Sequence, residues 1–371
     1  MTEIYLIRHT QAEGNLYHMM QGHWDGGVTP LGRRQIAALT ERFRGVPVDA
    51  VYSSDLYRAV STAEAVARPK GLPVHTDSRL REINVGPWEA QYFGNAFYRE
   101  PEAFQRFIYE PEKFYLEGAE TYAQVGDRVY EALTEIAAAH DGQTVAVASH
   151  GVSIRCALSR ITGTPLKDMP LSGNTGVSHL FFDGVGFTAD YINDVSHLPE
   201  ALRRQSAQPS LRHVSIDPQE HERFYKACYE DAWLSAHGNL AGYAGQAYFD
   251  SALSHFRHDP EAVCVIYDGE EPAGLIDLDT QRGVHAGYGW ISLLYLRPEY
   301  RGRGLGVQLL ARAMFKYEAM GRGALRLHVS EDNAPALAFY RRWGFEALST
   351  EPGARWRLCL MEKKLGGHRD V

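Results

Sequence analysis

Hydrophobic residues in the first half of the chain form short uninterrupted runs, separated by segments with helical periodicity. Apolar runs cover residues 4–7, 50–52 and 145–148, and such runs are typical of strands covered on both faces of a parallel sheet. After a helix start signal at residues 29–32, apolar side chains recur at helical spacing as Ile36, Leu39 and Phe43. The alternation predicts a three-layer α/β/α domain over residues 1–198.

Two segments interrupt this pattern. Residues 87–118 are aromatic and polar without clear periodicity, which indicates a helical insertion or lid. Residues 199–214 are polar and contain two prolines, which predicts a linker before a second domain at 215–371.

The second half predicts a mixed α/β domain. Leu325, Leu327 and Val329 alternate as in a half-buried strand. The other expected elements are a helix ending near His237, a helix at 246–256, strands at 262–267, 273–278 and 290–296, and helices at 305–320 and 335–343.

Composition narrows the classes of partner. The 371 residues exceed what one core usually supports. Acidic residues outnumber basic ones, 46 to 38, and there is no basic run, so small molecules are expected rather than nucleic acid or an anionic membrane. The four cysteines form no CxxC pair and are expected to be buried thiols. No apolar stretch is long enough to span a bilayer, and a cytoplasmic location is expected.

Polar residues of unusual kind follow the predicted strands of the first half. Arg8-His9 follows the first strand, residues 53–58 end in Arg58 after the second, Glu82 lies in a connection, and His150 follows a later strand. Ligands bind beyond the carboxyl ends of strands in such sheets. Two guanidinium groups, two imidazoles and a carboxylate suit a phosphate, because arginine offers planar donors and neutral imidazole can attack phosphorus.

These segments resemble the histidine phosphatase, or phosphoglycerate-mutase-like, superfamily over residues 1–195, including the segment 174–178. The resemblance implies that His9 is the phosphorylated nucleophile and Glu82 the proton donor, with no metal. It also implies that further residues bind the transferring phosphoryl group or line its entrance: Arg8, Arg58 and His150, and Asn15, Gln21 and Gly22.

Two positions depart from the family pattern. Thr10 stands where glycine is frequent, and Ala90 replaces a glycine that commonly follows the Trp-Glu pair, a change expected to affect the lid rather than the chemistry. Residues 16–32 resemble the phosphatase branch more than the mutases, so hydrolysis is favoured. Transfer to a bound hydroxyl, a mutase reaction, remains the alternative.

A glycine-rich turn joins a strand to a helix in the second half, within LYLRPEYRGRGLGVQLL at 294–310. Bare backbone N–H groups at a helix start accept a pyrophosphate. Residues 301–306 and 333–345 resemble the GNAT family of acyl-CoA-dependent N-acetyltransferases over about 215–365. The resemblance implies acetyl-CoA as co-substrate and Tyr340 as the group that protonates the leaving thiolate. It implies CoA contacts from Leu296, Arg301, Gly302, Arg303, Gly304, Leu305, Gly306 and Asn333.

No general base is identified. Asp277, Asp279 and Glu299 are candidates by position only, and water is an alternative. His255 and His258 share a helical face, but no third ligand is evident, so a surface location is expected rather than a metal pair.

The leading hypothesis is a bifunctional enzyme. It combines phosphomonoester hydrolysis through a phosphohistidine with acetyl-CoA-dependent N-acetylation of a small-molecule amine. Two alternatives are an acyl-CoA-binding module that regulates the phosphatase, and a phosphoryl mutase. A scaffold with both sites inactive is disfavoured by the complete first set of residues.

Overall fold

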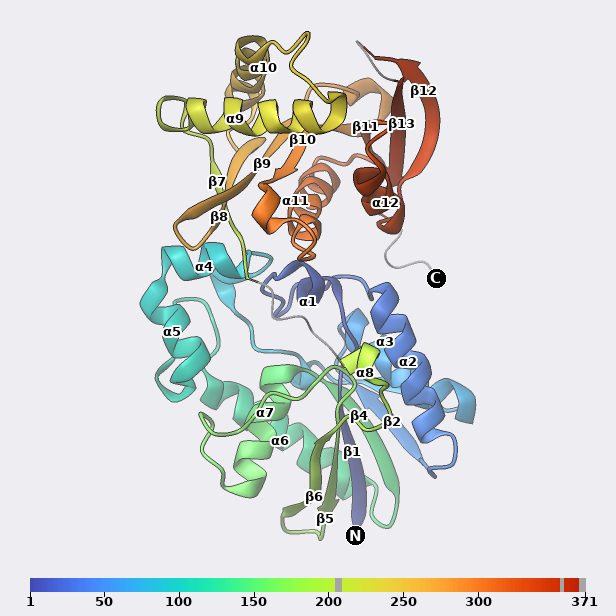
Figure 1. The fold of residues 1–371 in the computed structure, drawn as a ribbon. Coiled ribbons are helices and arrows are strands. Elements are labelled where there is room, and N and C mark those ends of the chain that lie inside the picture. The colour runs from blue at the N-terminus through green and yellow to red at the C-terminus, as the bar shows by residue number, and fades with distance from the viewer. Residues whose placement is uncertain (204–208, 354–356, 367–371) are drawn as a thin grey trace. The chain divides into compact units, whose positions relative to one another are not determined.

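The computed structural model describes residues 1–203, 209–353 and 357–366. It divides into two compact units, Met1–Ala207 and Gln208–Val371 (Figure 1). Each unit has its own sheet and hydrophobic core.

The sheet of the N-terminal unit has the strand order β3-β2-β4-β1-β5-β6. The first four strands of this order are parallel, β5 is antiparallel to β1, and β6 is antiparallel to β5. The three apolar runs form the central strands, which confirms that prediction. The strands are β1 (Thr2–Arg8), β2 (Ala50–Ser53), β3 (Val74–Thr76), β4 (Thr144–Ser149), β5 (Val177–Phe182) and β6 (Phe187–Asp194).

Helices cover both faces of this sheet, so the predicted three layers are present (Figure 1). Successive residues of β4 face different cores. Val145 and Val147 belong to the core that includes residues of α6 and α7, whereas Ala146 and Ala148 pack with residues of α2 and α3. The helices are α1 (Glu13–Tyr17), α2 (Pro30–Phe43), α3 (Tyr57–Ala67), α6 (Tyr122–Ala139), α7 (Gly151–Thr162) and α8 (Glu200–Arg203).

The aromatic segment at 87–118 is a helical insertion, as predicted. It contains α4 (Phe93–Arg99) and α5 (Pro101–Tyr109) together with short 3-10 turns. Trp88 is buried at its centre, with its ring 5.7 to 5.8 Å from the rings of Phe104, Phe107 and Phe114. These rings belong to the same core cluster as residues of β4, α6 and α7, so the insertion packs onto the domain through its aromatic side chains.

The C-terminal unit has a seven-stranded sheet in the order β12-β13-β11-β10-β9-β8-β7. All neighbouring strands are antiparallel except β10 and β11. Its strands are β7 (Arg212–Ser215), β8 (Val263–Asp268), β9 (Glu271–Asp279), β10 (Tyr288–Leu296), β11 (Ala324–Ser330), β12 (Glu346–Pro352) and β13 (Arg357–Lys364).

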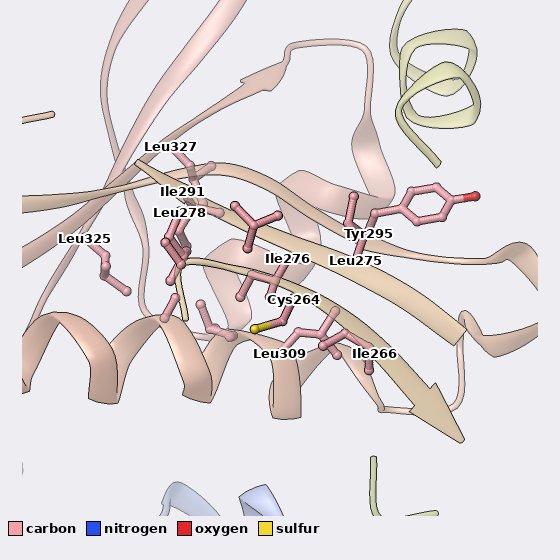
Figure 2. Close-up of a cluster of buried hydrophobic side chains, with 14 of the residues drawn as sticks. Cys264, Ile266, Leu275, Ile276, Leu278, Ile291, Tyr295, Leu309, Leu325 and Leu327 are labelled. Atoms are coloured by element: carbon pink, nitrogen blue, oxygen red, sulfur yellow. The ribbon is translucent and has the colours of Figure 1, made fainter. Parts of the chain in front are cut away.

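Four helices pack on this sheet: α9 (Pro218–His237), α10 (Gly245–His258), α11 (Gly306–Ala319) and α12 (Ala334–Arg342). Figure 2 shows part of the core, in which Leu309 of α11 belongs to the same cluster as Cys264, Ile276, Leu278 and Leu325 of the sheet. All four cysteines of the chain are buried and free, as expected. Within the described ranges, no helix is long and apolar enough to cross a membrane.

The range 199–214, predicted as a linker, contains regular structure at both ends. Glu200–Arg203 forms α8, and Arg212–Ser215 forms β7, which pairs with β8 at the edge of the C-terminal sheet. Residues 204–208 lie outside the described residues. Strands β12 and β13 were also not predicted from the sequence. An edge strand such as β12 is exposed along its whole length, so it lacks the apolar alternation that marks a strand.

The two departures from the family pattern have different structural consequences. Thr10 is buried, and its hydroxyl donates to the carbonyl oxygen of Gly32 at 2.7 Å. Ala90 has a φ of 59°, in the left-handed region, where its N–H donates to the carbonyl oxygen of Met20. A side chain at positive φ is strained by about 1–2 kcal/mol.

We expect Ala90→Gly to stabilise the chain by about 0.5–1 kcal/mol, because relief of strain exceeds the entropy that glycine adds to the unfolded chain. Thermal unfolding would measure the change. Ala138→Gly, on the exposed face of α6, is the matched control and should destabilise by about 1 kcal/mol. A lower melting temperature for Ala90→Gly would contradict the argument.

Candidate active sites

The two histidines predicted for the phosphate site lie together at the carboxyl ends of β1 and β4. Arg8, the last residue of β1, pairs with Ser149, the last residue of β4. The next residues, His9 and His150, therefore come side by side, with ring centroids 5.1 Å apart. Both are buried. The register of one parallel strand pair thus assembles the centre of the site.

His9 is held in one tautomer. Its Nδ1 lies 2.6 Å from the carbonyl oxygen of Thr10, which can only accept, so Nδ1 carries the proton and Nε2 the lone pair. Burial, followed by the charges of Arg58 and Arg8, holds the pKa of His9 well below its ordinary value. Burial and Arg58 lower the pKa of His150 in the same way. His9 is therefore neutral near pH 7, as a nucleophile must be.

Arg58 lies in the first turn of α3 and is entirely buried. Its Nη1 donates to the carbonyl oxygen of Trp24 at 2.9 Å and lies 3.4 Å from a carboxylate oxygen of Asp25. Its Nη2 donates to the carbonyl oxygens of Gly22 and Gln21 at 2.7 and 3.1 Å. These bonds fix the guanidinium plane and partly offset the cost of burying its charge.

Four buried nitrogen atoms around His9 have no hydrogen-bond partner in the described part of the chain. They are Nε of Arg8, Nε of Arg58 and both ring nitrogens of His150. Buried polar atoms in folded proteins are almost always paired. Guanidinium N–H groups bind phosphate oxygens well. The unpaired atoms beside a neutral imidazole therefore fit a phosphoryl group as the missing partner.

Gly22 holds the entrance loop close to the site because no side chain fits there. A Cβ at this position would lie 2.2 Å from Oε1 of Glu89 and 2.3 Å from the carbonyl oxygen of Ile83. Glu89 accepts the N–H groups of His23 and Trp24 at 2.8 and 2.7 Å. Glu89, which was not predicted from the sequence, holds the loop whose carbonyl groups bind the guanidinium of Arg58.

Asn15 and Gln21 belong to the same loop region. The amide oxygen of Asn15 accepts the N–H of Ala12 at 3.0 Å, so part of this side chain caps α1. The Oε1 atom of Gln21 is buried and has no partner among the described residues. Contact of either side chain with a phosphoryl group stays a prediction.

Glu82 lies against the first turn of α7. Its carboxylate accepts the N–H groups of Val152 and Ser153 at 3.1 Å and that of Ile83 at 3.0 Å. A helix N-terminus stabilises negative charge nearby. The structure therefore places Glu82 beside the first turn of the helix that follows His150, in contacts that use it as an acceptor. Its role as proton donor stays a prediction.

Arg128, on α6, holds the segment that carries Glu82. Arg128 was not predicted from the sequence. Its Nη1 donates to the carbonyl oxygens of Arg79 and Arg81 at 2.7 and 2.6 Å, and its Nη2 to that of Glu82 at 2.9 Å. Glu120 pairs with Arg128 at 2.8 Å. Because these acceptors are backbone oxygens, no pattern of residue types in the sequence predicts the contacts of Arg128.

In the C-terminal unit the glycine-rich turn has the predicted form. Gly302 and Gly304 have φ angles of 71° and 79°, which favour glycine. Helix α11 starts at Gly306, and the preceding Leu305 supplies no side-chain cap. The first N–H groups of α11 are therefore available to an anion, and the turn fits a pyrophosphate.

The two arginines of this turn pack on tyrosines. Arg301 donates to the carboxylate of Asp231 on α9, which also accepts the hydroxyl of Tyr295 at 2.7 Å. The guanidinium of Arg303 lies over the ring of Tyr300, 5.4 Å from its centroid. Arg301 therefore fixes the turn against α9, and its contact with CoA stays a prediction.

Strands β10 and β11 pair only at their beginnings, up to Trp290 opposite Arg326. Both strands continue, β10 to Leu296 and β11 to Ser330. The carbonyl oxygen of Leu296 accepts from Nε of Arg301 at 2.7 Å. The two strands therefore separate after Trp290 and Arg326, and the contact of Leu296 with CoA stays a prediction.

Asn333 and Tyr340 lie at the two ends of α12. The amide oxygen of Asn333 caps the helix by accepting the N–H of Ala336 at 3.2 Å. Tyr340 is buried, with its ring 5.2 Å from those of Phe339 and Phe345, and burial raises its pKa. A raised pKa keeps the phenol protonated, so Tyr340 has a proton to give. Its catalytic role stays a prediction.

The expectation that both His255 and His258 lie on the surface is wrong for His255. His255 is buried where α10 packs on β9, and its Nδ1 lies 2.7 Å from Oδ1 of Asp277. Its Nε2 lies 3.5 Å from Oδ2 of Asp279. His258, one turn further, is exposed. The third positional candidate, Glu299, forms an ion pair on the turn before α11. Among described residues, no group of three side chains could hold a metal ion.

Comparison with protein families assigns both units. The family described as "Histidine phosphatase superfamily (branch 1)" matches residues 4–195, and the family described as "Acetyltransferase (GNAT) family" matches residues 218–345.

Individual relatives match about half of this chain, a length similar to that of the N-terminal unit. Phosphoserine phosphatase 1 of Hydrogenobacter thermophilus is 33% identical over 167 residues, 45% of this chain and 79% of that protein. The probable phosphoglycerate mutase GpmB of Salmonella choleraesuis is 29% identical over 206 residues, 53% of this chain and 95% of that protein. The solved structure of Bacillus stearothermophilus YhfR is 33% identical, with a TM-score of 0.52, and covers 53% of this chain and 99% of its own.

The lowered pKa values of His9 and His150 predict acid lability. As the pH falls below 6.5, the unfolded chain takes up protons that the two buried imidazoles do not, so stability falls by up to about 1.4 kcal/mol per pH unit for each histidine. Urea unfolding at pH 7.0 and 5.5 in phosphate-free buffer would measure the loss. His150→Gln should lose less than wild type over this interval. An equal loss would contradict the assignment.

Proposed function

The chain belongs to the histidine phosphatase superfamily and carries a GNAT-family acetyltransferase domain, and on this premise we propose that it is a bifunctional enzyme. It hydrolyses a small phosphomonoester through a phosphohistidine in the N-terminal unit and transfers an acetyl group to a small-molecule amine in the C-terminal unit. The observation that carries the first activity is the set of unpaired buried nitrogen atoms on Arg8, Arg58 and His150 around a neutral His9.

The phosphatase reaction proceeds in two displacements. Nε2 of His9 attacks phosphorus while the P–O bond to the leaving group breaks, and Glu82 gives the leaving oxygen its proton. Arg8, Arg58 and His150 bind the phosphoryl oxygens, where charge accumulates. Water then attacks phosphorus, gives a proton to Glu82, and releases phosphate and His9. Both displacements use the same five side chains.

The acetyltransferase reaction uses the strand opening and the turn before α11. Backbone N–H groups at the start of α11, with Gly302 and Gly304, hold the CoA pyrophosphate. The thioester supplies the acyl group, and its place is between the separating ends of β10 and β11. Tyr340 gives a proton to the departing sulfur.

A compound that bears both a phosphate and an amine would serve both units in sequence. Two of the relatives are a phosphoserine phosphatase and a putative phosphoserine phosphatase of Hydrogenobacter thermophilus. Phosphoserine carries both groups, and its dephosphorylated product keeps the amine. We therefore take phosphoserine as the first substrate to test and serine as the first acceptor.

We expect His9→Ala to reduce phosphate release by at least about 10³-fold, because the nucleophile is lost. Quenched wild-type enzyme should carry an acid-labile phosphate that the variant lacks. His75→Gln, at an exposed histidine of β3, is the control and should keep the wild-type rate. Normal turnover by His9→Ala would exclude the phosphohistidine route.

The products of the same reaction separate hydrolysis from the mutase alternative. Hydrolysis yields free phosphate and the dephosphorylated alcohol in equal amounts. A mutase yields an isomeric phosphoester with little free phosphate, and 3-phosphoglycerate is the probe for that outcome because one relative is a probable phosphoglycerate mutase.

We expect the wild-type chain to release CoA from acetyl-CoA when a suitable amine is present, and Tyr340→Phe to release it about 10–100-fold more slowly because the departing thiolate loses its proton donor. Serine, phosphoserine, ethanolamine, phosphoethanolamine and spermidine form the panel. Phe339→Leu, at the neighbouring aromatic residue, is the control for helix packing. Binding of acetyl-CoA without release for every amine would favour the regulatory-module alternative.

A further inference from the structure

The side chains of His255, Asp277 and Tyr225 form a hydrogen-bond network within the apolar contact between the C-terminal sheet and its helices α9 and α10. Nδ1 of His255 on α10 lies 2.7 Å from Oδ1 of Asp277 on β9. The hydroxyl of Tyr225 on α9 donates to Oδ2 of the same carboxylate at 2.8 Å. Asp277 is 1% exposed and Tyr225 is fully buried. A buried carboxylate is costly unless it is paired in this way.

This hydrogen-bond network fixes the orientation of the His255 imidazole. The ring nitrogen that faces Asp277 carries a proton, because a carboxylate only accepts. Nε2 is therefore the nitrogen that can gain or lose a proton. It lies 3.5 Å from Oδ2 of Asp279, whose side chain is 24% exposed. A proton on Nε2 thus has a path to the surface past Asp279.

The sheet register places this hydrogen-bond network beside the point where β10 separates from β11. Asp279 pairs across the sheet with Trp290, the last residue of β10 that is also paired with β11. Asp277 pairs with Leu293. The register of β10 shifts between Ile291 and Leu293, which is a bulge of the kind often found beside active sites. The two carboxylates therefore flank the segment of β10 that borders the strand opening.

We propose that His255, oriented by Asp277, is the general base that deprotonates the acceptor amine. The assignment rests on the proposed acetyltransferase function and names a residue that neither the family resemblance nor sequence position suggests. Asp279 draws the cationic ammonium to the site. Tyr225 holds the second oxygen of Asp277 and is a positioning residue.

The proton and electron balance is complete. An N–H bond of the ammonium breaks and an N–H bond forms at Nε2 of His255. The free amine attacks the thioester carbonyl, a C–N bond forms, and the C–S bond breaks. Tyr340 gives its proton to the departing sulfur, and the second proton of the amine, lost as the amide forms, returns through solvent to the Tyr340 phenolate. His255 then returns its proton to solvent past Asp279.

The surroundings of His255 support this role. Burial lowers the pKa of His255, but the hydrogen bond and charge of Asp277 and the charge of Asp279 outweigh burial and raise it. A raised pKa makes the neutral imidazole a stronger base. β8 places Val263 opposite Asp277. Further titratable groups near these side chains include Tyr229 of α9, Tyr243 between α9 and α10, and Tyr317 of α11.

The first test compares His255→Gln with His258→Gln, the exposed histidine of the same helix. With the amine panel and acetyl-CoA, we expect His255→Gln to lower the maximal rate of CoA release by about 10²-fold. The rising limb of its pH–rate profile should disappear. His258→Gln should match wild type. Calorimetric binding of acetyl-CoA should be unchanged in both variants, which shows that the C-terminal unit is folded.

Tyr225→Phe gives a second test that keeps the buried shape. Removing the hydroxyl leaves Asp277 with one donor fewer, so the carboxylate should hold the imidazole proton more tightly. We expect the imidazole resonances of His255 to titrate in wild-type protein with a pKa above 6.5 and in Tyr225→Phe with a higher pKa still. The rising limb of the pH–rate profile should move to higher pH by the same amount. A purely structural contact would leave the limb in place.

The outcomes separate the two levels of the proposal. If wild type acetylates an amine and His255→Gln keeps both its rate and its profile, the base assignment is overturned while the acetyltransferase function stands. If His255→Gln fails to bind acetyl-CoA, an unmoved limb in Tyr225→Phe overturns the assignment instead. If wild type acetylates none of the amines, the proposed function is overturned, and the assignment with it.

Discussion

The burial of guanidinium nitrogen atoms of Arg8 and Arg58 near His9 is the constraint on which the N-terminal site depends. Arg58 is completely buried, and backbone carbonyl groups of the entrance loop accept its Nη protons. Those carbonyl groups stay in place because Glu89 binds the N–H groups of the same loop and because Gly22 has no side chain. The Nε atoms are left for a ligand. The site is therefore organised for an anion before any anion arrives.

Both sites lie where parallel strands end or separate. In a parallel pair the carboxyl ends lie at the same edge, so residues from distant parts of the chain meet there. Arg8 opposite Ser149 places His9 beside His150. In the C-terminal sheet, β10 and β11 form the one parallel pair among the described strands, and they separate after Trp290. A strand that leaves its neighbour exposes backbone groups for a ligand, which an unbroken antiparallel ladder does not.

The sequence predicted those parts of the structure that can be built only from a particular type of residue. Buried parallel strands require apolar runs, and the polar residues that end them stand out. Edge strands such as β12 and β7 carry no such signal. Arg128 and Glu89 were missed because they bind backbone groups, which every residue has. His255 had a usable signal, since it recurs at helical spacing with Phe249 and Ala252, both buried.

The two histidines assigned to chemistry show how surroundings set the role of one residue type. His9 is buried near two arginines, and burial together with their charges lowers its pKa, so it keeps the lone pair that attack on phosphorus requires. His255 lies between two carboxylates and its pKa is raised, so its neutral form binds a proton strongly. A nucleophile with the second environment would lose its lone pair to a proton over a wider range of pH, and a base with the first would accept protons weakly. Each environment therefore suits the reaction of its own unit and would impair the other.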